Sequence, residues 1–269
     1  MTQPPGPRGR VIPRLDIKGP NVVKGVHLEG LRVVGDPAAL ALKYYHAGAD
    51  ELIYMDIVAS LYGRNSLLDI VERAARDIFI PLTVGGGVRT LEDFRRLLRA
   101  GADKVSVNTA AVRNPAFITE ASRSFGSQCV VVSIEAKHRG PGRWEALTDN
   151  GRETTGLDAV HWALKAVELG AGELLVTSVD QEGTGKGYDL ELLSKVARAV
   201  PVPVIASGGA GSPGHVAQAV LHGGADAVSI AAILHYNRFT LAQVKDALAA
   251  AGISARANPF AGSPALGEI

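Results

Sequence analysis

Two stretches of equal length decide the fold of this chain: IPLTVGGGVRTLEDFRRLLRAGADKVSVNTAAV at residues 80–112 and VPVIASGGAGSPGHVAQAVLHGGADAVSIAAIL at residues 202–234. Each begins with a proline-containing apolar run, continues through glycines and a helical pattern, and ends with GAD and a second apolar run. The second stretch starts 122 residues after the first (202 − 80). Self-similarity at a fixed offset predicts that two halves of about 120 residues share one structural plan.

The same alternation of short apolar runs and helical patterns extends over the whole chain. Runs rich in β-branched residues predict strands at about 11–16, 51–56, 80–84, 103–107, 129–135, 172–178, 202–206 and 226–230. Helical patterns follow at about 36–47, 66–77, 90–100, 113–125, 156–169, 189–199, 213–223 and 239–251. Strand and helix therefore alternate eight times, as in a series of βαβ units.

Eight such units predict an α/β fold, a (βα)8 TIM barrel with a two-fold internal repeat. Strands such as VVVSI at 130–134 are apolar on consecutive positions, which is typical of parallel strands buried on both faces. The predicted single barrel spans 10–253, with half-barrels at about 10–125 and 126–253. An open doubly wound sheet is the alternative, and two similar four-strand halves favour closure instead.

Three segments fall outside the repeating plan. Residues 138–155 contain the run RWEALT and a DNG turn, which predict a small β-hairpin on the catalytic rim. Residues 1–9 and 254–269 are rich in Pro, Gly and polar residues, and we expect them to be flexible tails.

Composition excludes several classes of protein. A net charge of +1 gives no electrostatic support for a nucleic-acid or membrane partner. The single cysteine excludes an intrachain disulfide. No apolar run approaches the length of a membrane span, and the N-terminus lacks the apolar core of a signal peptide, so we expect a cytoplasmic protein. The seven histidines show no ligand spacing and no GxGxxG follows the first strand, so we expect no metal and no cofactor.

Glycines follow two of the predicted strands, at symmetry-related positions. A loop without Cβ atoms that leads into a helix presents backbone N–H groups to an anion. Two such loops across one barrel mouth predict a substrate with a phosphate at each end, and close packing of the backbone is the alternative explanation. The predicted phosphate-binding residues are Gly86 and Gly87 with Asn108 and Thr109, and Gly208 and Gly209 with Ala231 and Ala232.

Two carboxylates are expected on opposite sides of the mouth. Asp16 ends the first predicted strand and Glu135 ends the fifth, and these strands are diametrically opposed in an eight-stranded barrel. A facing pair of carboxylates provides a general acid and a general base. Either acid could instead be a solvated strand end or a helix cap.

Other polar residues are expected at the same rim. Asp56 ends the second strand, and Ser178 and Glu182 follow the sixth. Lys24 lies in the long segment 21–32 after the first strand, and loops of this length at the catalytic face often close over substrate. A plain surface lysine is the alternative for Lys24.

The opposite end of the barrel also carries charge. Two bases and two acids begin strands one, two, four and six, and charges at strand starts lie around the bottom opening. A balanced ring of this kind could plug a channel through the barrel. Its predicted members are Arg10, Glu51, Lys104 and Glu173.

Several motifs together resemble one known family. RVIPRLDIKGPNVVKG, GADELIYMDIVAS, IPLTVGGGV, GADKVSVNTAAV, GAGELLVTSVDQEGTGKGYD and PVIASGGAG are similar to the cyclase subunit of imidazole glycerol phosphate synthase. The resemblance covers about residues 10–253. It implies a lyase of histidine biosynthesis that works with a glutaminase subunit docked at the bottom of the barrel.

The resemblance also implies a reaction and residue roles. Ammonia from the glutaminase would pass the ring of Arg10, Glu51, Lys104 and Glu173 and attack a bis-phosphate ribulosyl aminoimidazole carboxamide ribotide. The products would be imidazole glycerol phosphate and an aminoimidazole carboxamide ribotide. By position, Asp16 would be the family's strand-one acid or base and Lys24 its loop lysine.

Four positions depart from the family pattern. Glu135 and Glu182 stand where the family favours Asp, Arg14 stands where many relatives have a small residue, and Ala232 replaces a hydroxyl residue. An Arg14 side chain that points into the barrel would obstruct ammonia or bind a new anion. These departures leave two alternatives: a cyclase-like subunit with another ammonia acceptor, such as a nucleotide sugar or surface glycan, and a non-catalytic docking partner of a glutaminase.

Overall fold

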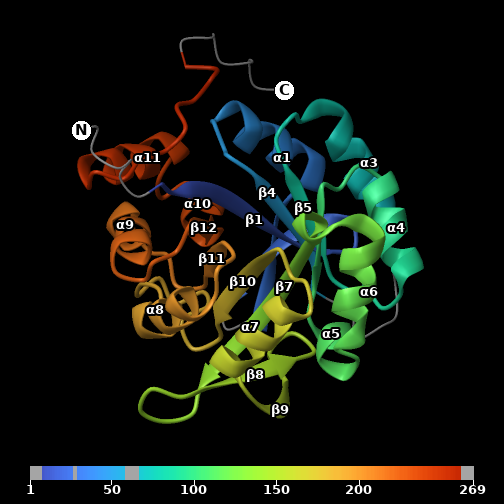
Figure 1. Ribbon diagram of the computed structural model, residues 1–269. Coiled ribbons are helices and arrows are strands. Elements are labelled where there is room, and N and C mark those ends of the chain that lie inside the picture. Colours follow the sequence, from blue (N-terminus) through green and yellow to red (C-terminus); the bar gives the residue numbers. More distant parts are fainter. Residues whose placement is uncertain (1–7, 27–28, 58–66, 262–269) are drawn as a thin grey trace, which may run out of the picture.

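The structure is a computed structural model that describes residues 8–26, 29–57 and 67–261. Eight parallel strands form a closed barrel with helices on its outside (Figure 1). The barrel strands are β1 (Arg10–Lys18), β4 (Leu52–Asp56), β5 (Leu82–Gly85), β6 (Lys104–Val107), β7 (Val130–His138), β10 (Glu173–Ser178), β11 (Val204–Ser207) and β12 (Ala227–Ile230). The predicted (βα)8 fold is therefore confirmed.

Pairing between β7 and β10 closes the barrel and excludes the open-sheet alternative. The other barrel strands pair in the order β10-β11-β12-β1-β4-β5-β6-β7. β7 and β10 then pair in parallel from Val131 opposite Glu173 to Ala136 opposite Ser178. No barrel edge is left for the helices to cover.

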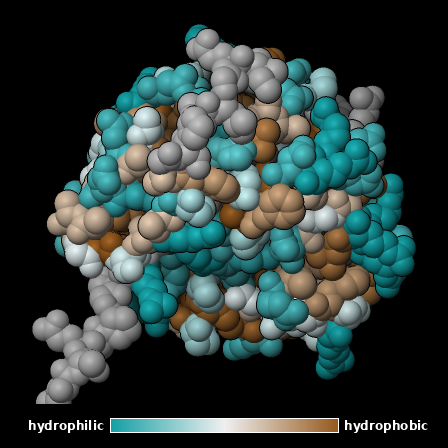
Figure 2. All heavy atoms as spheres, turned by 90° about the horizontal axis from the view of Figure 1, so that it is seen from above, coloured by the Kyte–Doolittle hydropathy of each residue, from teal (hydrophilic) through white to brown (hydrophobic). Residues whose placement is uncertain are grey.

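Helices cover the outer face of the barrel. They are α1 (Pro37–His46), α3 (Leu68–Asp77), α4 (Leu91–Arg99), α5 (Thr109–Arg113), α6 (Ala116–Phe125), α7 (Ala159–Glu168), α8 (Leu190–Ala199), α9 (Pro213–Leu221), α10 (Ala232–His235) and α11 (Leu241–Ala250), with a 3-10 turn η1 (Ser127–Cys129). Figure 2 shows the molecule from the top of the view in Figure 1. Hydrophilic and hydrophobic residues are interspersed on this face.

Local sequence signals explain where several helices begin and end. The Thr90 side chain accepts a hydrogen bond from the Asp93 amide, and the Asp93 side chain accepts one from the Thr90 amide, which satisfies two otherwise unpaired amides at the start of α4. The helix predicted at 113–125 corresponds to α6, which begins three residues later, and the separate short helix α5 ends just before Asn114. Pro115 disfavours a helical conformation at the residue before it, and Asn114 has φ −138° and ψ 88°.

Two hairpins extend the barrel at its carboxyl rim. β2 (Asn21–Val26) and β3 (Glu29–Gly35) form an antiparallel pair beside β1, where the sequence had indicated only a long loop. In the insert, β8 (Trp144–Thr148) and β9 (Glu153–Asp158) pair with each other and β8 pairs with β7. The DNG turn joins β8 and β9 with φ of 49° at Asp149, 63° at Asn150 and 75° at Gly151, a left-handed conformation that these residues tolerate.

Part of the expected C-terminal tail contacts the barrel. The carbonyl of Ser254 accepts a hydrogen bond from the Gly9 amide at 3.0 Å. The Phe260 ring packs against the Tyr45 ring with their centroids 4.9 Å apart. Residues 1–7 and 262–269 of the two expected tails lie outside the described residues.

Strand alternation divides the barrel interior into layers. Residues at every second position of β1 face inward, and Ile12 belongs to a buried apolar cluster separate from the outer core. Its other buried members are Ile53, Val131, Leu175, Ile205 and Ala227. Arg10 precedes Ile12 by two positions and lies below this apolar layer, whereas Arg14 and Asp16 follow it and lie above.

The outer core provides a test of the packing. Phe94 on α4 is fully buried and stacks on Phe125 with ring centroids 4.8 Å apart, so Phe94→Ala is expected to lower the free energy of unfolding by about 3–5 kcal/mol. Phe79 is 79% exposed, and the matched Phe79→Ala variant should change it by less than about 0.5 kcal/mol. Urea denaturation of the isolated chain measures both, and equal losses would contradict this packing.

Candidate active site at the barrel mouth

Two carboxylates face each other across the carboxyl end of the barrel. Asp16 on β1 and Glu135 on β7 are both buried. Around the closed sheet, β4, β5 and β6 separate β1 from β7 on one side, and β12, β11 and β10 separate them on the other. The two strands are therefore diametrically opposed, as the sequence predicted.

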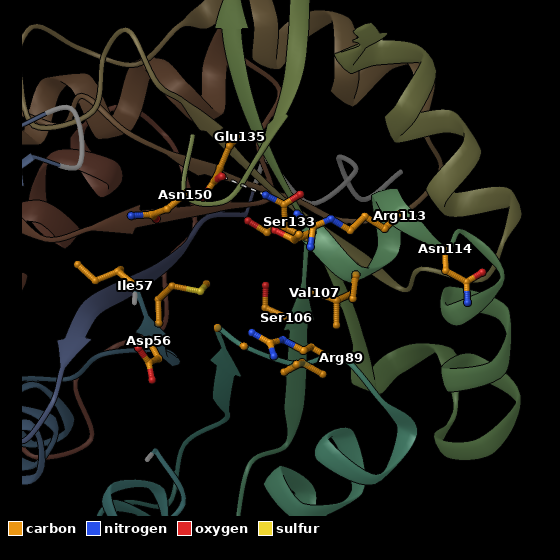
Figure 3. A pocket seen from close by; sticks show the side chains of 17 residues that line it. Asp56, Ile57, Arg89, Ser106, Val107, Arg113, Asn114, Ser133, Glu135 and Asn150 are labelled. Atoms are coloured by element: carbon orange, nitrogen blue, oxygen red, sulfur yellow. Dashed lines mark hydrogen bonds between the residues drawn. The ribbon is translucent and has the colours of Figure 1, made fainter. Parts of the chain in front are cut away.

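Glu135 is held from two sides. Its Oε2 atom accepts a hydrogen bond from Asn108 Nδ2 at 3.0 Å, drawn as a dashed line in Figure 3. The same atom accepts a second hydrogen bond from the Gly151 amide at 2.8 Å. Burial raises the pKa of Glu135 to about 7, although the nearby Arg14 cation and the Gly151 amide oppose that rise. A carboxyl group with a pKa near neutrality can hold a proton and release it, which suits a general acid.

Asp16 has the opposite electrostatic environment. Its Oδ1 atom accepts a hydrogen bond from Arg14 Nε at 2.7 Å, and its Oδ2 atom lies 3.5 Å from Lys24 Nζ. Burial by itself would raise the pKa of Asp16, but Arg14 and Lys24 outweigh burial and lower it. The pKa of Asp16 is therefore lowered where that of Glu135 is raised, and a pair of carboxyl groups with divergent pKa values is a candidate acid and base.

Lys24 reaches the mouth from the β2–β3 hairpin and is buried there. Its ammonium group forms an ion pair with Glu182 as well as contacting Asp16. Burial would lower the pKa of Lys24, but Glu182 and Asp16 raise it, so the side chain stays charged. Ser178 lies four residues before Glu182 in the sequence. Its hydroxyl is buried and has no hydrogen-bond partner among the described residues.

The first glycine loop, Gly85–Gly87, borders an open cavity of about 310 Å³ (Figure 3). Gly86 has φ of 99°, and a Cβ atom there would lie 2.1 Å from the Asp56 carbonyl oxygen, so only glycine fits. The predicted residues Asp56, Gly86, Gly87, Asn108, Thr109 and Glu135 line this cavity together. It also contains residues that sequence reasoning missed: Arg89, Ser106, Arg113, Ser133 and Asn150.

The hairpin insert completes this first cavity. Thr109 Oγ1 accepts a hydrogen bond from the Asp149 amide at 3.1 Å, and Arg113 forms an ion pair with Asp149 at 2.8 Å. These contacts hold the DNG turn over the rim, with Asn150 in the cavity wall and the Gly151 amide on Glu135. The sequence indicated a turn on the catalytic rim but not which carboxylate it would contact.

The second glycine loop, Ser207–Gly209, is much less open. Its glycines have φ of 90° and 106°, but the cavity beside them is only about 20 Å³. The predicted residues Lys24, Glu182, Gly208, Gly209, Ala231 and Ala232 line it, and so does Arg14. The backbone around the two loops is nonetheless repeated: φ and ψ are −131° and −85° at Asn108, and −134° and −77° at Ala231.

A closed ring of ion pairs, the basal ring, lies at the other end of the barrel. Arg10 contacts Glu51 and Glu173 at 2.6 Å each. Lys104 contacts the same two carboxylates at 2.9 and 2.8 Å. The four residues that the sequence placed at strand starts therefore meet on the barrel axis, below the apolar layer.

No group of three or more His, Cys, Asp or Glu in residues 8–26, 29–57 and 67–261 is arranged to hold a metal ion. Within the same residues, no helix has the length and apolarity needed to cross a membrane. The absence of a cofactor stays a prediction.

The comparisons with known proteins agree with one another. The sequence matches the family described as histidine biosynthesis protein over residues 10–240. It is also 64% identical over 202 residues to "Imidazole glycerol phosphate synthase subunit HisF" from Legionella pneumophila. That alignment covers 75% of this chain and 95% of the relative.

The environment of Glu135 generates a pH prediction. Folding raises its pKa from 4.5 to about 7, so this group's contribution to stability is present below pH 4.5 and is lost as pH rises to about 7. Glu135→Gln removes the ionisable group. The free energy of unfolding of the variant minus that of the wild type should therefore increase between pH 4.5 and 7 and then level off. Urea denaturation across this range measures the difference, and a flat or falling profile would contradict the assignment.

Proposed function

Because the chain belongs to the family of imidazole glycerol phosphate synthase cyclase subunits, we propose that its two opposed carboxylates at the barrel mouth carry out the ring closure. The protein is an enzyme, a lyase of histidine biosynthesis. The observation that carries the mechanism is that the two acids at one mouth have pKa values shifted in opposite directions. The pKa of Asp16 is lowered, and that of Glu135 is raised to about 7.

The proposed substrate is a bis-phosphate ribulosyl aminoimidazole carboxamide ribotide. Ammonia attacks its ribulosyl carbon chain, and cleavage with ring closure releases imidazole glycerol phosphate and an aminoimidazole carboxamide ribotide. Asp16 accepts a proton as ammonia adds, and Glu135 donates one to the departing group on the opposite side. The two glycine loops hold the two phosphates, so the reacting centre is suspended between the acids.

Ammonia is supplied from the other end of the barrel. The relative's name describes it as one subunit of a synthase. We propose that the partner subunit is a glutaminase and place it at the face where the barrel strands begin. Two features support this face: the basal ring lies there, and Phe79, three residues before β5, is 79% exposed. The apolar layer above the ring favours neutral ammonia over ammonium, because burial of an unpaired charge is costly.

Turnover without the partner tests the cyclase function. The isolated chain with saturating ammonium salt at alkaline pH should convert the bis-phosphate substrate to the two products, each detected chromatographically. No turnover, together with stimulation of a glutaminase, would favour the non-catalytic docking role. No turnover with the bis-phosphate but ammonia transfer to another acceptor would favour the divergent subunit. A cytoplasmic location and the absence of nucleic-acid and membrane partners stay predictions from the sequence.

Variants of the two acids test their roles. Asp16→Asn should lower kcat by roughly 100-fold or more, because a base within the mouth is lost. Glu135→Asp should also lower kcat on the order of 100-fold, since the shorter side chain withdraws from Asn108 and Gly151 by about one methylene. Steady-state kinetics with ammonium measure both. A large gain in kcat for Glu135→Asp would show that the native site is tuned to another substrate.

The basal ring generates a separate prediction about ammonia delivery. Lys104 bridges Glu51 and Glu173, so Lys104→Ala opens the ring and leaves two buried carboxylates with one cation. The glutamine-dependent rate of the complex should fall several-fold relative to the ammonium-dependent rate. Lys165→Ala, at an exposed lysine on α7, is the matched control and should leave the ratio unchanged. An unchanged ratio in Lys104→Ala would remove the ring from the ammonia path.

A further inference from the structure

Arg14 is a buried cation at the mouth that the proposed reaction has not used. Strand alternation puts it on the inner face of β1, two positions from Asp16, and it is only 5% exposed. Its side chain lines the second cavity together with Gly208, Gly209 and Ala231. The guanidinium therefore lies beside the second glycine loop and inside the barrel.

Most donors of this guanidinium have no partner among the described residues. A guanidinium carries five N–H groups. Arg14 Nε donates to Asp16 Oδ1 at 2.7 Å, and Nη1 makes a long contact of 3.4 Å with Ser207 Oγ. Nη2 donates to no residue of the part of the chain that the structure describes. A buried charge with unused donors is costly unless a ligand completes it, so this geometry indicates an anion.

The second glycine loop also lacks the polar side chains that accompany the first loop. The first loop is accompanied by an amide and a hydroxyl, Asn108 and Thr109, whereas the second is accompanied by Ala231 and Ala232. The backbone at the two companion positions is nearly the same, so the difference is one of side chains alone. Side-chain donors for a phosphate at the second loop must therefore come from the other polar residues that line its cavity, which are Arg14, Lys24, Ser207 and Ser229. Of these, the Arg14 guanidinium offers paired N–H groups that match phosphate geometry.

We propose that Arg14 binds the substrate phosphate held at the second glycine loop and is thereby a specificity-determining residue for doubly phosphorylated substrate. The inference rests on the proposed cyclase function and names one partner of that substrate. The Nη1 and Nη2 groups bind phosphate while Nε keeps its hydrogen bond to Asp16. Phosphate binding and the ionised state of Asp16 are thus connected through one side chain.

The size of the second cavity adds a requirement. At about 20 Å³ it is too small for a phosphate group with Arg14 where it lies. The guanidinium must give up its long contact with Ser207 when phosphate binds. A competing explanation is that Arg14 simply fills the site and excludes phosphate, and the two explanations predict opposite effects of removing the side chain.

Each reaction product carries one phosphate, so product binding separates the two loops. Isothermal titration would measure the affinity of imidazole glycerol phosphate and of the aminoimidazole carboxamide ribotide for the wild type and for Arg14→Gln. Arg14→Gln should weaken one product on the order of 10- to 100-fold and leave the other within about two-fold. Arg14→Lys keeps the charge without the paired donors and should be intermediate.

Arg89→Gln is the matched control because Arg89 lines the first cavity. This control should weaken the product that Arg14→Gln leaves unchanged. In kinetics with saturating ammonium, Arg14→Gln should raise the KM for the bis-phosphate substrate by more than it lowers kcat. Retained binding of one product shows that the variant is folded.

Three results would overturn the inference. Tighter binding of either product to Arg14→Gln would mean that Arg14 excludes phosphate. Equal weakening of both products would mean that Arg14 only supports the fold or Asp16. Unchanged binding of both would remove it from the site. Failure of the cyclase function is distinguishable: the wild type would show no turnover, while titration with inorganic phosphate would still show whether binding depends on Arg14.

Discussion

Backbone pairing between β7 and β10 is the constraint on which the rest of this structure depends. It converts a row of strands into a closed barrel, so that every inward-facing residue converges on one axis. Residues far apart in sequence then form layers at defined heights. The basal ring, the apolar layer and the carboxylate mouth are successive layers of that kind, and an open sheet would separate Asp16 from Glu135 instead of opposing them.

Electrostatics at the mouth show how one buried environment gives two acids different pKa values. Burial pushes the pKa of both carboxyl groups upward. Asp16 contacts two cations that reverse this effect, whereas Glu135 is bound by neutral donors from Asn108 and Gly151. The identity of the neighbours, rather than the extra methylene of Glu, therefore determines which group holds a proton near neutral pH.

The two halves of the barrel have kept their backbone plan while their rims have diverged. The first glycine loop borders a large cavity that is partly lined by the turn between β8 and β9. The second borders a small cavity lined by Arg14, Lys24 and Glu182. Side chains supply this asymmetry, since the companion residues Asn108 and Ala231 share nearly the same φ and ψ. A substrate with two different ends, each phosphorylated, is suited to such a pair of unequal sites.

The sequence by itself determined the (βα)8 fold, the strand ends that carry Asp16 and Glu135, the two glycine loops and the members of the basal ring. These follow from short-range periodicity and from the repeat of one pattern along the chain, both of which can be read from the sequence alone. Only the tertiary structure decided that Lys24 pairs with Glu182, that the insert's Gly151 contacts Glu135, and that Arg14 turns its guanidinium toward Asp16 and the second glycine loop. Such contacts join residues up to 193 positions apart in the chain, as between Arg14 and Ser207. No local pattern encodes them, because they depend on which side chains the closed barrel brings within reach.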